Sequence, residues 1–184
     1  KKAEKSLLEK QQRLERNFRY QKMVADIVAL LNSTNDFTQV TRHLLELLTQ
    51  HYLIGKVSIY RLNEAEEIED VIASRVSAYG KGMAELNEKD YHKLNRMIAK
   101  VKQAPYFLSE DLGNLTAEER DFYQKRKIGA VALFPIRIGQ KIFGMAGFAQ
   151  PETQKWDQRE VNEIATIVRM IANAWERQMQ MNKY

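Results

Sequence analysis

The stretch Ala130–Gln150, AVALFPIRIGQKIFGMAGFAQ, decides the fold of this 184-residue chain. It contains two apolar runs, Ala130–Ile138 and Lys141–Ala149, which are joined by Gly139-Gln140. A glycine at the first central position of a two-residue link permits a type II′ turn, whose twist suits antiparallel strands. Because both runs are apolar on both faces, we expect a hairpin at the centre of a sheet that is covered on each side.

The sequence around this hairpin predicts further helices and strands. Capping patterns at Asp36, Thr116 and Asp157 each predict the start of a helix. The order of elements gives an α+β domain: a central antiparallel sheet with helices on both faces and a long helix at each terminus. The expected elements are helices over 1–32, 36–48, 87–102, 116–128 and 157–184, and strands over 56–62, 68–77, 106–109, 130–138 and 141–149.

Composition limits the class of protein. The chain has no cysteine, which excludes disulfides, thiolate metal sites, cysteine nucleophiles and thioether-linked chromophores. No apolar run reaches the roughly 20 residues that span a bilayer, and no signal-peptide pattern opens the chain. The chain begins at Lys1 rather than Met. We therefore expect a cytoplasmic piece of a longer protein, with no membrane contact within this segment.

The net charge of +5 comes from one segment. Residues 1–22 contain eight basic and three acidic side chains, and the remainder is neutral overall. A basic helix could bind nucleic acid, but no aromatic-interleaved basic patch accompanies it. A solvated helix face is the simpler interpretation, so we expect no nucleic-acid partner.

The two terminal helices both show heptad spacing of apolar residues. In the first, Leu7, Leu14 and Phe18 lie on a seam that Gln11 and Gln21 weaken, and a second stripe begins at Tyr20. We expect this helix to change partner near Phe18, from another helix to its own domain. The last helix has its own seam, of Val161, Ile164, Val168, Ile171 and Trp175.

The element order over Tyr20–Trp175 resembles the GAF domains of bacterial sensory proteins. Pro105–Gly147 is similar to the family pattern of a short strand, an Asp, a helix, a Gly and an apolar strand with a Pro-Ile pair. A polar turn and two glycines three residues apart follow. A proline inside a strand otherwise indicates an edge or a bulge, and the family tolerates proline here. The matching residues are Asp111, Gly129, Pro135, Ile136, Gly144, Gly147 and Trp156.

The resemblance implies a small-molecule pocket on one face of the sheet. Its roof would be the segment Ala78–Lys127, between the second strand and the central hairpin. Aromatic residues are more often core than ligand contacts, and Asp111 could simply cap a turn. The implied ligand-binding residues are Tyr60, Tyr106, Ser109, Asp111, Tyr123, Phe134 and Met145.

The resemblance also implies a homodimer through paired terminal helices. The expected domain limits are a linker helix over 1–19, the sensory domain over 20–175, and the start of an output helix over 176–184. An effector such as a histidine kinase or a cyclic-dinucleotide enzyme would follow. The expected interface residues are Leu7, Leu14, Phe18, Val168, Ile171 and Trp175.

Several activities of GAF relatives need residues that this chain lacks. Covalent bilin attachment and methionine-sulfoxide reduction both need cysteine, and the signature of cyclic-nucleotide-binding members is missing. His92 is the only histidine of the roof, so we expect no haem and no metal. No nucleotide-binding or hydrolase motif appears. We therefore expect a non-catalytic sensor of an unknown small molecule. The alternatives are a ligand-free dimerisation spacer and a nucleic-acid-binding regulator.

Overall fold

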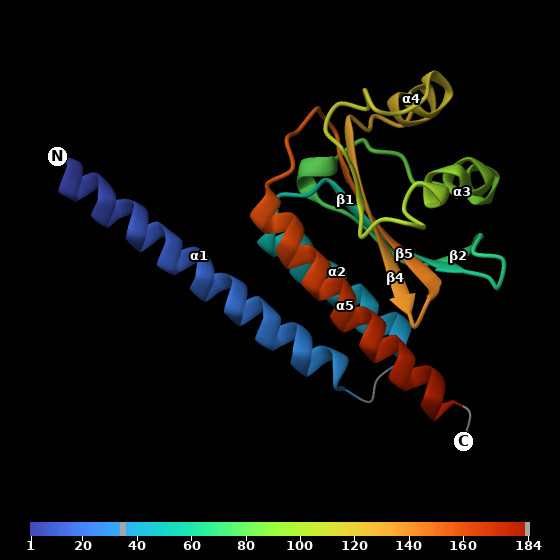
Figure 1. Cartoon of the computed structure of the whole chain (residues 1–184), viewed down its shortest axis with the longest axis horizontal. Coiled ribbons are helices and arrows are strands. Elements are labelled where there is room, and N and C mark those ends of the chain that lie inside the picture. The colour runs from blue at the N-terminus through green and yellow to red at the C-terminus, as the bar shows by residue number, and fades with distance from the viewer. Residues whose placement is uncertain (34–35, 183–184) are drawn as a thin grey trace.

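The computed structural model describes residues 1–33 and 36–182 (Figure 1). Two short 3-10 turns, Ala78–Gly80 and Glu88–Asp90, precede the third helix. The helices are α1 (Lys2–Leu31), α2 (Phe37–His51), α3 (Tyr91–Ala99), α4 (Ala117–Gln124) and α5 (Gln158–Met181). The strands are β1 (Lys56–Leu62), β2 (Ile68–Val76), β3 (Phe107–Ser109), β4 (Ala130–Ile138) and β5 (Lys141–Gln150).

The five strands form one antiparallel sheet in the order β2-β1-β5-β4-β3. The predicted central hairpin is confirmed, because β5 lies in the middle of the sheet, between β1 and β4. Ile138 pairs with Lys141 across the two-residue link. Gly139 has φ +64°, and Gln140 is not among the described residues with positive φ, which is the pattern of a type II′ turn.

Pro135 stands at a local edge of the sheet. The pairing of β3 with β4 does not extend past Leu133, which lies opposite Phe107, the first residue of β3. At Pro135 the strand β4 therefore pairs only with β5. A strand proline is tolerated at an edge because its missing N–H breaks no bond to an outer neighbour.

The sheet has helices on both of its faces (Figure 1), and the residues buried on the two faces form separate cores. On one face α2 packs on β1 and β2, and α5 packs on β4, with α1 against α2. On the other face lie α3, α4 and the loops of the roof. We call the first group of buried residues the terminal-helix core; it includes Ile27, Leu44, Ile59, Phe134, Phe148, Ile171 and Trp175. The second is the roof core, which includes Tyr60, Met97, Ile98, Phe122, Tyr123, Leu133 and Met145.

The predicted helix starts are confirmed by their capping bonds. The Asp36 carboxylate accepts a hydrogen bond from the Thr38 N–H at 3.4 Å, and Asp157 accepts from the Arg159 N–H at 2.8 Å. Thr116 and Glu119 form a reciprocal capping box at 3.2 and 2.9 Å.

The helix expected over 87–102 is shorter in the structure. Asn87 and Asp90 do form a capping box, but it opens a 3-10 turn, and α3 spans Tyr91–Ala99. At the far end the N–H groups of Lys100 and Val101 bond three residues back, to Met97 and Ile98, which tightens the chain out of the α-helix.

Gly144 allows the last helix to approach the sheet. A Cβ atom at this position would lie 2.8 Å from Cζ3 of Trp175 and 2.8 Å from the carbonyl oxygen of Tyr60. The Trp175 ring therefore lies directly against the backbone of β5 at this position. Among the described residues, no helix is both long enough and apolar enough to cross a membrane.

Candidate functional site

The helix α1 has two halves with different surroundings. Every residue from Lys1 to Arg19 is exposed, whereas Met23 and Ile27 are buried in the terminal-helix core. The side chains of Leu7, Leu14 and Phe18 are 67%, 60% and 68% exposed. The first half of α1 therefore presents apolar side chains that the rest of the chain does not cover.

These apolar side chains point away from the domain. Residues seven apart lie on nearly the same face of a helix, with about 3.6 residues per turn. Arg16 and Glu9 are seven and fourteen residues before the buried Met23, so they lie on the inner face of α1. Counting forward from Leu7 through Leu14 gives Val28, which is exposed although it lies in the packed half. The apolar stripe is thus on the outer face of α1.

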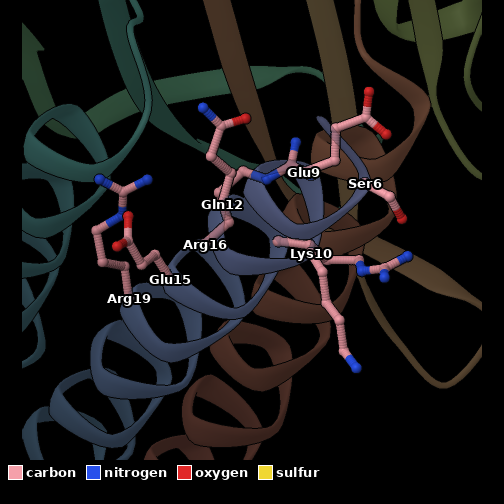
Figure 2. A pocket seen from close by; sticks show the side chains of 8 residues that line it. Ser6, Glu9, Lys10, Gln12, Glu15, Arg16 and Arg19 are labelled. Atoms are coloured by element: carbon pink, nitrogen blue, oxygen red, sulfur yellow. The ribbon is translucent and has the colours of Figure 1, made fainter. Parts of the chain in front are cut away.

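The inner face of the same half is polar. Figure 2 shows the side chains that line a furrow along this part of α1, and all of them belong to this one helix. The furrow is therefore a gap between side chains of a solvated helix and not an enclosed cavity. Its lining residues are Ser6, Glu9, Lys10, Gln12, Arg13, Glu15, Arg16 and Arg19.

The stripe on α5 has a different role. Val168, Ile171 and Trp175 are only 5%, 2% and 8% exposed, and the Trp175 ring lies 5.3 Å from the ring of Phe37. The structure places these three residues in the terminal-helix core, which corrects the expectation that they form a dimer interface. The physical reason is that an apolar stripe already buried on the helix's own sheet has no surface left for a second copy.

Three of the seven expected ligand-binding residues come together in the roof core. Tyr60 and Met145 are paired across β1 and β5, and Tyr123 reaches the same core from α4. Burial raises the pKa of Tyr60 and the pKa of Tyr123 well above the ordinary tyrosine value. Both hydroxyls therefore stay protonated, and each can donate a hydrogen bond inside this largely apolar core.

Phe134 and Tyr106 lie on the opposite face of the sheet. The Phe134 ring is 5.7 Å from the ring of Tyr106 and 5.4 Å from that of Phe148, all within or against the terminal-helix core. Side chains alternate between faces along a strand, and Leu133 points into the roof core. The placement of Phe134 and Tyr106 with Tyr60 and Met145 was wrong for this reason.

Ser109 and Asp111 shape a turn at the end of β3. The buried Ser109 hydroxyl accepts a hydrogen bond from the Leu112 N–H at 3.0 Å. Its carbonyl oxygen accepts from the indole N–H of Trp156 at 3.1 Å. The exposed Asp111 accepts from the Gly113 N–H at 2.8 Å. The turn-capping interpretation of Asp111 matches this geometry.

The roof is closely packed in this structure. The hollow between α3 and α4, lined by Met97, Phe122 and Tyr123 among others, has a volume of about 10 Å³. A cavity needs roughly 10–15 Å³ to hold even one water molecule. This part of the roof core therefore leaves no room for a small-molecule ligand unless α3 and α4 move apart.

Polar contacts that the sequence analysis missed join the roof to the sheet and the two helical parts of the roof to each other. The buried Lys56 amine donates to the carbonyl oxygen of Ala84 at 3.1 Å. Burial lowers the pKa of Lys56, Glu85 opposes this shift, and Arg126 adds to it. An ion pair of 2.6 Å joins Arg126 to Asp90. The one available signal was a lysine at the first position of β1, where a buried amine needs a polar partner.

The histidines are spread over the molecule. His43 and His92 are exposed, and His51 lies 4.6 Å from the ring of Tyr52 and 6.4 Å from that of Tyr20, measured between ring centroids. Within the described residues, no three His, Asp or Glu side chains form a group that could hold a metal ion.

Comparison with known proteins identifies the fold. No family model and no curated protein matches the sequence. A phycocyanobilin-bound GAF domain from a cyanobacterial phytochrome matches with a TM-score of 0.75 over 90% of this chain and 98% of its own, at 11% identity. A domain assigned to a two-component sensor histidine kinase of Sinorhizobium meliloti 1021 gives a TM-score of 0.58, covering 78% and 93% at 15% identity.

A third solved structure agrees with these two. The GAF domain region of a Geobacter sulfurreducens PCA protein matches with a TM-score of 0.58 over 77% of this chain and 93% of its own, at 17% identity. The chain therefore has the GAF fold, as the order and spacing of its sequence motifs predicted.

Proposed function

We propose that this GAF domain is a regulatory, non-catalytic sensory module of a larger cytoplasmic signalling protein. Structures of similar fold include a domain from a phytochrome and one assigned to a sensor histidine kinase. In this proposal the terminal helices pass a conformational change between the domain and an attached effector. The effector is a histidine kinase or a cyclic-dinucleotide enzyme that follows α5.

The outward apolar stripe of α1 is the observation that supports this function most strongly. Leu7, Leu14 and Phe18 are exposed and face away from their own domain. A second copy of α1 would cover them in a two-helix seam, with the weak positions Gln11 and Gln21 keeping the dimer in the micromolar range. Residues 1–19 then serve as the linker helix, and 176–184 begin the output helix.

The roof core is the proposed place for a small-molecule ligand. Tyr60 and Met145 on the sheet and Tyr123 on α4 would line opposite sides of the pocket once α3 and α4 move apart. Opening would release the Arg126–Asp90 ion pair and the Lys56 contact with Ala84. Ligand binding would thus favour an open roof over the closed one described here.

A second candidate function is that of a ligand-free dimerisation spacer. The small hollow between α3 and α4 and the filled roof core favour it. Binding of nucleic acid through the basic side chains of α1 is a third candidate, and salt-sensitive binding to duplex DNA would support it.

Sedimentation equilibrium of one matched pair of variants tests the proposed dimer. Leu14→Glu places a charge in the outward stripe, and Gln12→Glu adds the same charge on the polar side of α1. We expect Leu14→Glu to make the protein monomeric at concentrations where wild type and Gln12→Glu are dimers. Equal association of all three proteins would rule out pairing through α1.

Native mass spectrometry of the same preparations separates the sensor from the spacer. A non-covalent adduct of defined mass that is lost in Tyr123→Ala supports a ligand in the roof core. An adduct-free protein from every growth condition supports the spacer.

A further inference from the structure

The sheet has an uncovered margin on its terminal-helix face. The strand β3 pairs with β4 only as far as Leu133, so Phe134 to Ile138 have no outer neighbour. On this face α2 packs on β1 and β2, and α5 packs on β4. A groove of about 670 Å³ remains between the open stretch of β4 and the outer side of α5. We call it the β4–α5 groove.

The floor of the β4–α5 groove is apolar. Phe134, Pro135, Val168 and Ala172 line it, and all four residues are buried. The volume falls within the range of about 300–1,000 Å³ that is typical of small-molecule sites. The groove lies across the sheet from Tyr60, Tyr123 and Met145, so it is separate from the roof core.

Among the residues that the structure describes, the only charged groups that line the β4–α5 groove are Arg137 and Arg169. Neither Arg137 nor Arg169 forms an ion pair with a carboxylate of the described residues. The Nη2 atom of Arg137 donates to the carbonyl oxygens of Val101, Lys102 and Ala104, at 2.7, 2.9 and 3.0 Å. This anchors the guanidinium, while its Nε and Nη1 atoms have no hydrogen bond within the described residues.

We propose that the β4–α5 groove binds an organic anion with an apolar body, such as a medium-chain or aromatic carboxylate or sulfonate. The apolar body covers Phe134, Pro135 and Ala172, and the anionic head accepts hydrogen bonds from Arg137 and Arg169. Both arginines can donate charge-assisted hydrogen bonds to such a head. Arg137 does so singly, from Nε or Nη1, because Nη2 is already bonded to the three carbonyl oxygens. A bound anion contacts β4 and α5 together, and it therefore fixes the last helix against the sheet.

Charge decides between this ligand and a second copy of the chain. The one large uncovered apolar stripe among the described residues is that of α1, on a segment whose first 22 residues hold the whole net charge of +5. Placing that basic helix beside two arginines that have no carboxylate partner among the described residues would bring like charges together. A small bound anion neutralises the charge of the two arginines and leaves α1 free to pair with the α1 helix of a second copy.

Fluorescence titration with 8-anilinonaphthalene-1-sulfonate tests the site directly. Its neutral counterpart, N-phenyl-1-naphthylamine, has the same aromatic body without the sulfonate. We expect saturable binding of the anionic probe at one site, at least roughly tenfold tighter than the neutral probe, since a hydrogen bond to a charged group contributes this much or more. Decanoate should displace it.

Three variants connect the binding to the groove. Arg169→Gln removes an exposed groove charge, and Arg42→Gln removes an exposed charge on α2 as its matched control. Ala165→Trp, on the half-buried outer side of α5, fills the groove. Arg169→Gln should weaken the anionic probe about tenfold and abolish its advantage over the neutral probe. Ala165→Trp should abolish binding, and Arg42→Gln should change neither value.

Two results would overturn the proposal. The first is anionic-probe binding of wild-type strength in both Arg169→Gln and Ala165→Trp, with melting temperatures showing that each is folded. The second is a groove that binds protein: no probe binds, and Ala165→Trp shifts the monomer–dimer equilibrium in sedimentation.

Discussion

The first half of α1 and the helix α5 have similar apolar spacing in the sequence but opposite surroundings in the structure. Leu7, Leu14 and Phe18 are exposed, whereas Val168 and Trp175 are buried on the sheet. The α5 stripe is unbroken from Val161 to Trp175, and that of α1 is interrupted by Gln11 and Gln21. A continuous apolar stripe buries more area when it packs in the core of its own domain. An interrupted stripe buries less there, so it stays exposed and can pair with another chain.

The largest effect should come from removing the anchor of the buried stripe. Trp175→Ala leaves a cavity between α5, Phe37 and Gly144 and should lower the free energy of unfolding by about 3–5 kcal/mol. The dimer constant, extrapolated to fully folded protein, should not change. Urea denaturation and analytical ultracentrifugation measure the two quantities. A weaker dimer with an unchanged free energy of unfolding would show that Trp175 belongs to the dimer interface and not to the domain core.

Gly144 tests the same packing from the side of the sheet. Gly144→Ala places a Cβ atom 2.8 Å from the Trp175 ring and from the Tyr60 carbonyl oxygen. Overpacking of this kind should reduce stability by about 1–3 kcal/mol. Gly147→Ala is a useful control, because its Cβ would meet only ordinary contacts of 3.5 and 3.6 Å. Equal melting temperatures for the two variants would contradict the close approach of α5.

The exposed stripe should respond in the opposite way. Phe18→Ala should leave the free energy of unfolding of the domain within about 0.5 kcal/mol of wild type, as expected of a surface substitution. It should weaken the proposed dimer by about 1–2 kcal/mol, as an aromatic contact in a small interface would. Sedimentation equilibrium measures the dimer, and a Phe18→Ala protein that dimerises like wild type would remove this residue from the seam.

The contrast also explains how much of the molecule the sequence could predict. Glycine at 139 and the caps at Asp36, Thr116 and Asp157 act through neighbouring residues, so local patterns placed the hairpin and the helix starts. Whether an apolar stripe packs on its own domain or on another chain depends on which surface lies opposite it. Neighbouring residues in the sequence do not determine that surface. The spacing of Val168 and Trp175 therefore predicted an apolar face correctly but gave it the wrong partner.

The candidate site was harder to predict for a similar reason. Both runs of the hairpin are apolar on both faces, so the pattern does not show which face Phe134 occupies. Side chains alternate between the faces of a strand, so once Leu133 is known to face the roof core, its neighbour Phe134 must face the terminal-helix core. The β4–α5 groove depends on where β3 begins, because Phe107 pairs with Leu133 and leaves the rest of β4 open. The sequence pattern predicted a strand from Tyr106 but did not show which residue of β4 lies beside its first residue.

The smallest predicted effect is a pH dependence at the junction of α1 with the domain. His51 lies beside the rings of Tyr20 and Tyr52, and burial lowers the pKa of His51. Glu163 opposes the shift, while Arg19 and Arg159 add to it. Because the unfolded chain binds the proton first, near the ordinary pKa of about 6.5, stability should fall as the pH drops below that value.

Two histidine variants isolate this contribution. Denaturation of His51→Gln and wild type between about pH 5.5 and 8 should show a smaller loss at low pH in the variant. His43→Gln removes an exposed histidine of the same helix and should follow wild type. Burial raises the pKa of Glu160, which favours the folded state as the pH falls, but this contribution is common to all three proteins and cancels in their differences. Because Tyr20 belongs to the packed half of α1, the effect should appear in unfolding and leave the pairing through Leu7, Leu14 and Phe18 unchanged; parallel curves for all three proteins would show that His51 is not desolvated at this junction.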